Sequence, residues 1–161
     1  LPRQQIPDPL EVPLAKATAH ALPVAIGLAQ DQGQLHACLT HGVQLGGGTD
    51  INKALTYCQG LIRRPEDTII VLISDLYEGG NNAELLKRTA TLLGSGVQMI
   101  SLLALADDGA PCFDANNAAH FTTLGAPTFA CTPDLFPDLM AAALNKQDIG
   151  VWAAMQGIVK H

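Results

Sequence analysis

The sequence predicts an α/β fold that is Rossmann-like, with a mainly parallel sheet flanked by helices. Two continuous apolar runs, Thr68–Ser74 and Val97–Leu105, are typical of strands that are covered on both faces. Amphipathic segments with helical spacing lie around them. Because strands and helices alternate across residues 49–145, the chain favours the architecture in which helices connect parallel strands.

Composition limits the classes of function. The chain has 161 residues, 9 Lys and Arg against 15 Asp and Glu, and 48% hydrophobic residues, which fits one acidic domain with a core. A net charge of −6 argues against nucleic acid as a partner. No apolar run approaches the roughly 20 residues that span a membrane. Four scattered cysteines without a C-x-x-C pair, and no signal peptide, predict a cytoplasmic protein with reduced thiols.

Residues 1–42 are expected to form an irregular, proline-rich entry segment. Five prolines lie within residues 1–23 and exclude a long helix or a central strand there. A short helix over Leu14–Ala21 fits between them. Pro23–Ala29 is a candidate buried strand, and Gln34–Leu39 is a weaker one.

The first half of the domain predicted over residues 43–145 contains a glycine loop, a helix and a strand. Gly46, Gly47 and Gly48 form the loop, and Thr49 or Asp50 caps the helix that follows. That helix has apolar residues at helical spacing, namely Ile51, Leu55, Cys58 and Ile62. The strand Thr68–Ser74 comes next, and Asp75 stands at its carboxyl end.

The second half repeats this alternation. Asn81 or Asn82 caps a helix that runs to Leu93, and the glycines around Ser95 end it before the second buried strand. The remaining elements are a helix from Asp114 to Leu124, a short strand at Pro127–Cys131, a helix that begins at Thr132, and a C-terminal helix over residues 146–161 with Ile149, Trp152, Met155 and Ile158 on its apolar face.

Asp75 is the strongest candidate for chemistry. Ligands of open parallel sheets gather at the carboxyl ends of the strands, and a carboxylate there is a good ligand for a hard cation. The loop that ends in Thr49 offers a hydroxyl from a second element of the same rim. On these grounds alone a turn-forming or helix-capping Asp75 is an equally good interpretation.

Two motifs resemble a known family. Leu45-Gly-Gly-Gly-Thr-Asp-Ile51 and Ile73-Ser-Asp-Leu-Tyr-Glu-Gly-Gly80, with a helix and a strand between them, resemble the von Willebrand factor type A (VWA) domains of bacterial intracellular proteins. The family builds a metal-ion-dependent adhesion site (MIDAS) from an Asp-x-Ser-x-Ser, a Thr and an Asp. The resemblance implies that Thr49 and Asp75 are metal ligands, within loops that include Gly46, Gly47, Gly48, Asp50 and Ser74.

The first motif of that site is absent from the sequence. The chain has three serines, and none of them lies in an Asp-x-Ser-x-Ser. We therefore expect either a domain whose upstream part lies outside these residues or a naturally shortened relative. Because one carboxylate and one hydroxyl hold a six-coordinate ion poorly, we expect Mg²⁺ or Mn²⁺ to bind this chain alone weakly or not at all.

The resemblance implies a non-enzymatic protein-interaction module, with an AAA+ ATPase as a plausible class of partner. Two alternatives stay open: a Mg²⁺-dependent α/β enzyme acting on a phosphorylated small molecule, and a shortened chain that folds only as a homo-oligomer. A zinc site at His36, Cys38 and His41 is disfavoured because no well-spaced second pair of ligands follows.

Overall fold

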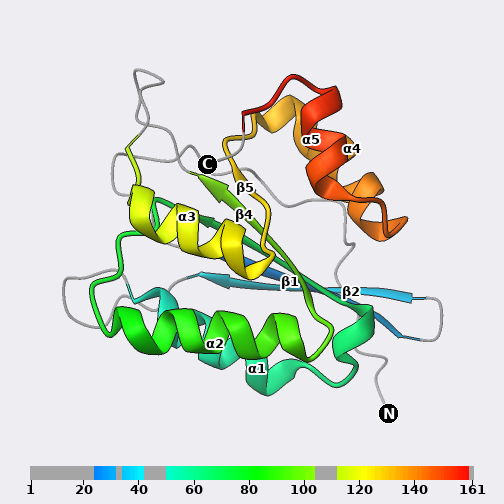
Figure 1. Cartoon of the computed structure of the whole chain (residues 1–161). Coiled ribbons are helices and arrows are strands. Elements are labelled where there is room, and N and C mark those ends of the chain that lie inside the picture. The colour runs from blue at the N-terminus through cyan, green and yellow to red at the C-terminus, as the bar shows by residue number, and fades with distance from the viewer. Residues whose placement is uncertain (1–23, 32–33, 42–49, 104–111, 160–161) are drawn as a thin grey trace, which may run out of the picture.

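A computed structural model describes residues 24–31, 34–41, 50–103 and 112–159 of the chain. Two expectations from the sequence fall outside these ranges: the short helix over residues 14–21 and the glycine loop with Thr49. Within the described ranges the α/β fold is confirmed, because a sheet lies between two layers of helices (Figure 1).

The sheet has five strands in the order β2-β1-β3-β4-β5. Their bounds are β1 Val24–Asp31, β2 Gln34–His41, β3 Thr68–Ser74, β4 Gln98–Leu103 and β5 Thr128–Phe129. The strands β3, β4 and β5 are parallel, as the sequence predicts. The two candidate strands of the entry segment, β1 and β2, form a hairpin, and β1 pairs antiparallel with β3. The parallel part of the sheet therefore consists of β3, β4 and β5.

The helices cover both faces of β3 and β4 (Figure 1). Their bounds are α1 Ile51–Leu61, α2 Asn82–Gly94, α3 Ala115–Leu124, α4 Phe136–Leu144 and α5 Ile149–Met155. The first three helices pack on one face and contribute Leu55, Leu85 and Phe121 to its core. The last two pack on the opposite face, where Leu139 and Trp152 are buried.

Strand β3 takes part in both cores because successive residues of a strand face opposite sides. Ile70 and Leu72 belong to the core under α1, α2 and α3, whereas Ile69 and Val71 belong to the core under α4 and α5. All four are buried, which explains why this segment is a continuous apolar run and not an alternating one.

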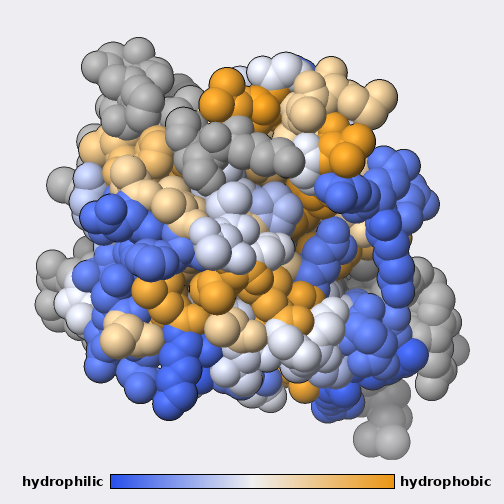
Figure 2. All heavy atoms as spheres, in the orientation of Figure 1, coloured by the Kyte–Doolittle hydropathy of each residue, from blue (hydrophilic) through white to orange (hydrophobic). Residues whose placement is uncertain are grey.

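Local signals set most helix ends where the sequence predicts them. Asp50, Asn81 and Asp114 accept backbone N–H groups in the first turns of α1, α2 and α3. Gly125 ends α3 at a φ of 103°, a left-handed conformation that glycine adopts without steric cost. Leu86 and Leu93 of α2 are partly buried and pack against the core on this face. Figure 2 shows hydrophobic residues gathered between α2 and α3.

The C-terminal part differs from the sequence prediction in two ways. A single turn of 3-10 helix, Pro133–Leu135, precedes α4, so the helix expected from Thr132 begins with a tighter turn. Met155 is 81% exposed although its spacing placed it on the apolar face of the last helix, because α5 ends at this residue. Trp152 packs against Phe129, with ring centroids 6.4 Å apart, as an anchor of the core.

Among the described residues, no helix is both long enough and apolar enough to cross a membrane.

Phe121 and Leu124 give a paired test of this packing. Phe121 is fully buried in the core under α3, whereas Leu124 is 36% exposed at the end of the same helix. We expect Phe121→Ala to lower the free energy of unfolding by about 3 to 5 kcal/mol because it removes a large buried ring and leaves a cavity. Leu124→Ala should cost less than about 1 kcal/mol. Urea unfolding measures both, and equal losses would contradict the described core.

Candidate functional site at the carboxyl end of β3

Asp75 directly follows β3 at the rim of the sheet, as the sequence predicts. Its side chain is partly exposed, and its Oδ1 accepts the N–H of Tyr77 at 3.1 Å. Among the described residues, no donor contacts the second carboxylate oxygen, Oδ2. Asp75 therefore forms a local turn through Oδ1, which among the described residues leaves Oδ2 without a donor, so the turn-forming and ligand interpretations are compatible.

Two further hydrogen bonds fix the backbone around Asp75. The Oγ of Ser74, which is fully buried, accepts the N–H of Leu76 at 3.0 Å. The carbonyl of Asp75 accepts the N–H of Asp114 at 2.8 Å, which joins this segment to the start of α3. Leu76 has a φ of 60°, a conformation that a residue other than glycine adopts only when its surroundings hold it there. Burial of the Leu76 side chain in the core supplies part of that restraint.

Asn117 supplies another part of the restraint. Only 2% of Asn117 is exposed, and its Nδ2 donates to the carbonyl of Leu76 at 2.9 Å. The two residues are 41 positions apart in the chain, so this hydrogen bond ties α3 to the rim segment. The Oδ1 of Asn117 is buried and has no hydrogen-bond partner among the described residues. An unpaired buried amide oxygen costs free energy. Among the described contacts, the hydrogen bond from Nδ2 is therefore the polar interaction that holds the Asn117 side chain in place.

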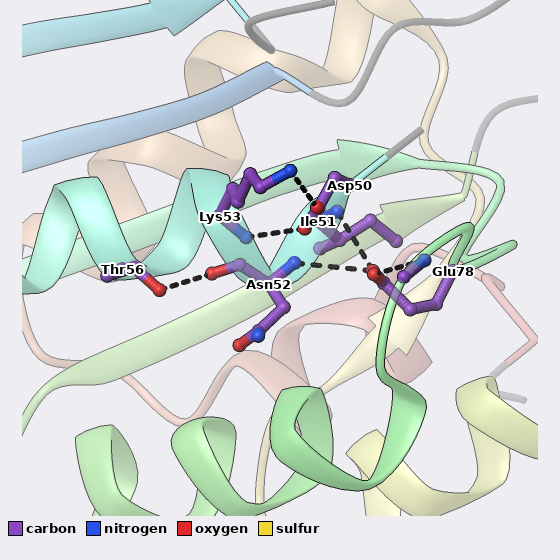
Figure 3. A network of polar contacts seen from close by, with 7 residues as sticks. Asp50, Ile51, Asn52, Lys53, Thr56 and Glu78 are labelled. Atoms are coloured by element: carbon purple, nitrogen blue, oxygen red, sulfur yellow. Dashed lines mark hydrogen bonds and ion pairs between the residues drawn. The ribbon is translucent and has the colours of Figure 1, made fainter. Parts of the chain in front are cut away.

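Glu78 joins the rim segment to the beginning of α1 (Figure 3). Its Oε2 accepts the N–H groups of Ile51 at 2.9 Å and of Asn52 at 3.2 Å. Its Oε1 accepts the N–H of Gly80 at 2.9 Å, within its own loop. Together with Asp50, which accepts the N–H of Lys53 at 2.8 Å, Glu78 satisfies the first three N–H groups of α1. Negative charge is also favourable at this end of a helix.

The two carboxylates at the start of α1 have pKa shifts in opposite directions. Burial raises the pKa of Glu78 above its ordinary value of 4.5, and the nearby charge of Asp50 adds to this effect, although the N–H groups that Glu78 accepts oppose it. Burial also tends to raise the pKa of Asp50, but the hydrogen bonds and charge of Lys53 outweigh it and lower that pKa below 3.8. The Lys53 ammonium lies 2.9 Å from Asp50 Oδ2.

The described donors do not complete a magnesium site. Mg²⁺ prefers about six oxygen ligands in an octahedron. The described carboxylates at the start of α1, Asp50 and Glu78, are already engaged, by Lys53 and by backbone N–H groups. No group of three His, Cys, Asp or Glu among the described residues is placed to hold a metal ion. Thr49, Gly46, Gly47 and Gly48 lie outside the described residues, so weak or absent binding of Mg²⁺ stays a prediction.

Sequence reasoning missed the roles of Glu78 and Asn117. Glu78 belongs to the motif after β3, and its place in that motif indicates no role of its own. A carboxylate that precedes two glycines beside a capped helix is a weak signal for its role. Asn117 follows Asn116, and only the packing of α3 buries one of these two and exposes the other. Asp50, in contrast, caps α1 as the sequence predicts.

Asn117 and Asn116 give a matched test of the contact between α3 and the rim. Asn117→Ala leaves the buried carbonyl of Leu76 without its donor, so we expect the free energy of unfolding to fall by about 1 to 3 kcal/mol. Asn116→Ala removes an exposed side chain of the same type and should change it by less than about 0.5 kcal/mol. Urea unfolding compares the two variants, and similar losses would show that the Asn117 contact contributes nothing.

The pKa shift of Glu78 predicts a particular dependence of stability on pH. Because its pKa is raised in the folded state, its contribution is fully present below pH 4.5 and is lost as pH rises through the folded pKa. Asp50 has the opposite sign, since its contribution is present above pH 3.8 and is lost as pH falls through its lowered pKa.

We therefore expect Glu78→Gln to make the free energy of unfolding fall less steeply as pH rises above 4.5. Urea unfolding of the native chain and the variant, from just below this pH to neutrality, measures the difference. Glu84→Gln, a change of an exposed residue in the first turn of α2, is the control. An unchanged slope in Glu78→Gln would contradict the prediction.

Comparison with known proteins places the fold in a family. The family described as "VWA domain containing CoxE-like protein" matches residues 28–140, which is more than half of the chain. A protein of Escherichia coli (strain K12), described as "Uncharacterized protein YehP", is 40% identical over 103 residues. The match covers 64% of this chain and 27% of that protein, so the chain spans about a quarter of the length of this curated relative. No solved structure matches the chain significantly. With the family matching across the sheet and the rim segment that bears Asp75, the chain belongs to the VWA domains of CoxE-like proteins.

Proposed function

We propose that the chain is a non-enzymatic VWA-type interaction module that binds another protein through the rim at the carboxyl end of β3. The observation that carries this proposal is the position of Asp75, with one carboxylate oxygen presented at the rim and a backbone held from α3. A rigid loop with an available carboxylate suits recognition of a partner's surface, either directly or through an ion to which the partner contributes a further ligand.

The neighbours of Asp75 support a binding role over an acid–base role. Asp75 accepts the backbone N–H groups of Tyr77 and Asp114, and the carboxylates of Asp50 and Glu78 are engaged by Lys53 and by the start of α1. We also propose Thr49, from the VWA-like motif of the sequence, as the second residue of a partial metal-ion-dependent adhesion site. We further propose an AAA+ ATPase as the class of partner and the cytoplasm as the location.

Titration with a metal ion tests the partial site. We expect no measurable binding of Mg²⁺ or Mn²⁺, or a Kd weaker than about 1 mM, because one carboxylate and one hydroxyl leave most of the coordination shell to water. Isothermal titration calorimetry of the native chain and Asp75→Ala measures this. A Kd tighter than about 1 mM that disappears in Asp75→Ala would contradict the expectation of a weak site and point to ligands beyond Thr49 and Asp75.

Asp75→Ala should change binding and leave the fold nearly intact. The side chain accepts one N–H, so we expect a loss in the free energy of unfolding of about 1 kcal/mol. A loss above about 3 kcal/mol would show that Asp75 is mainly structural. Urea unfolding measures this difference.

A retention experiment tests the interaction itself. The native chain, Asp75→Ala and Glu66→Ala are immobilised and exposed to an extract of the source cells, and the retained proteins are identified by mass spectrometry. Glu66 is an exposed acidic residue just before β3, at the opposite end of that strand from Asp75. We expect the native chain and Glu66→Ala to retain an AAA+ ATPase that Asp75→Ala does not. Equal retention by all three would refute a role for the rim.

A further inference from the structure

Glu78 connects two segments that are far apart in the chain. Its Oε2 lies between the N–H groups of Ile51 and Asn52, which are 27 and 26 positions away. Its Oε1 accepts the N–H of Gly80 and so holds the same carboxylate to its own loop. Both oxygens are therefore used by backbone donors, and one side chain fixes the start of α1 against the loop that follows Asp75 (Figure 3).

The surroundings of Glu78 are closely packed. A Cβ added to Gly80 would lie 2.7 Å from Glu78 Oε1 and 3.3 Å from Asp50 Oδ2, so a side chain at this position would require the Glu78 carboxylate to shift. The ion pair with Lys53 offsets the charge of Asp50 near Glu78. Asn52 extends the network to α2, because its Oδ1 accepts the Nε of Arg88 at 2.9 Å. The start of α1 is thus held by Glu78 on one side and by α2 on the other.

We propose that Glu78 is a positioning residue for the rim, which sets the beginning of α1 relative to the loop that bears Asp75. This inference rests on the proposed function, since it assigns Glu78 a role at the same binding site. In the sequence, α1 begins two residues after Thr49, and Glu78 lies three residues after Asp75. The Glu78 bridge therefore joins the segments that adjoin both candidate metal-site residues, without Glu78 itself offering an oxygen to a ligand.

A helix cap alone would have a different consequence. If Glu78 only stabilised the end of α1, its replacement would weaken the helix but leave binding at Asp75 unchanged wherever the chain stays folded. If Glu78 positions the rim, binding should fall together with the loss of the bridge. The two roles are separated by measuring the bridge and the binding in the same variants.

Amide hydrogen exchange, followed by NMR, measures the bridge directly. We expect Glu78→Ala to speed exchange at Ile51 and Asn52 by about tenfold or more, because both N–H groups lose a charged acceptor. Exchange at Leu85, whose N–H donates to the carbonyl of Asn81 within α2, should stay unchanged and shows that the chain is folded. Glu78→Asp keeps the charge but is one methylene shorter, so it should also release these amides. Glu84→Gln is the matched control on an exposed glutamate.

The same variants are then tested for retention of the partner captured by the native chain. The proposal expects Glu78→Ala and Glu78→Asp to retain at least about fivefold less partner than Glu84→Gln does. Faster exchange with normal retention would overturn the positioning role and leave the proposed function standing. Exchange within about twofold of the native rate at Ile51 and Asn52 would overturn the bridge itself. Retention by Asp75→Ala would instead refute the proposed function, whatever the exchange rates.

Discussion

The burial of β3 on both faces is the constraint on which the rest of the structure depends. Its residues alternate between two separate cores, so helices must cover each side of the sheet. It also pairs with β1 on one edge and with β4 on the other, which makes it the strand that joins the hairpin to the parallel half. Because β3 is held from every side, the position of the residue that follows it, Asp75, is fixed by the core.

The rim beyond β3 is held by polar contacts from two different helices. At the start of α3, the N–H of Asp114 and the side chain of Asn117 donate to two consecutive carbonyls of the rim, those of Asp75 and Leu76. Glu78 accepts the first N–H groups of α1. These contacts allow Leu76 to keep a left-handed backbone conformation at the exit of the strand. The segment that presents Asp75 is therefore rigid for physical reasons that are independent of any ligand, as a preorganised recognition site requires.

The roles of some residues at the candidate site follow from the sequence, and the roles of others do not. Asp75 could be placed at the rim because a carboxylate directly after a buried parallel strand has one location in this class of fold. Asp50 could be assigned as a cap because the capping residue and the first turn are neighbours in sequence. Glu78 and Asn117 could not be assigned their partners, because their contacts span 26 to 41 positions and depend on how α1 and α3 pack.

The sequence by itself determined the fold class, the limits of β3, the cap of α3, and the caps of α1 and α2 to within two neighbouring residues, since these follow from residue periodicity and from contacts within one helical turn. Only the tertiary structure decided that the hairpin joins β3 antiparallel, that Met155 is exposed beyond the core, and that Glu78 joins its own loop to the start of α1. Strand partners, the burial of a helix end and hydrogen bonds between distant segments all depend on which elements meet in space, and local patterning does not encode that information.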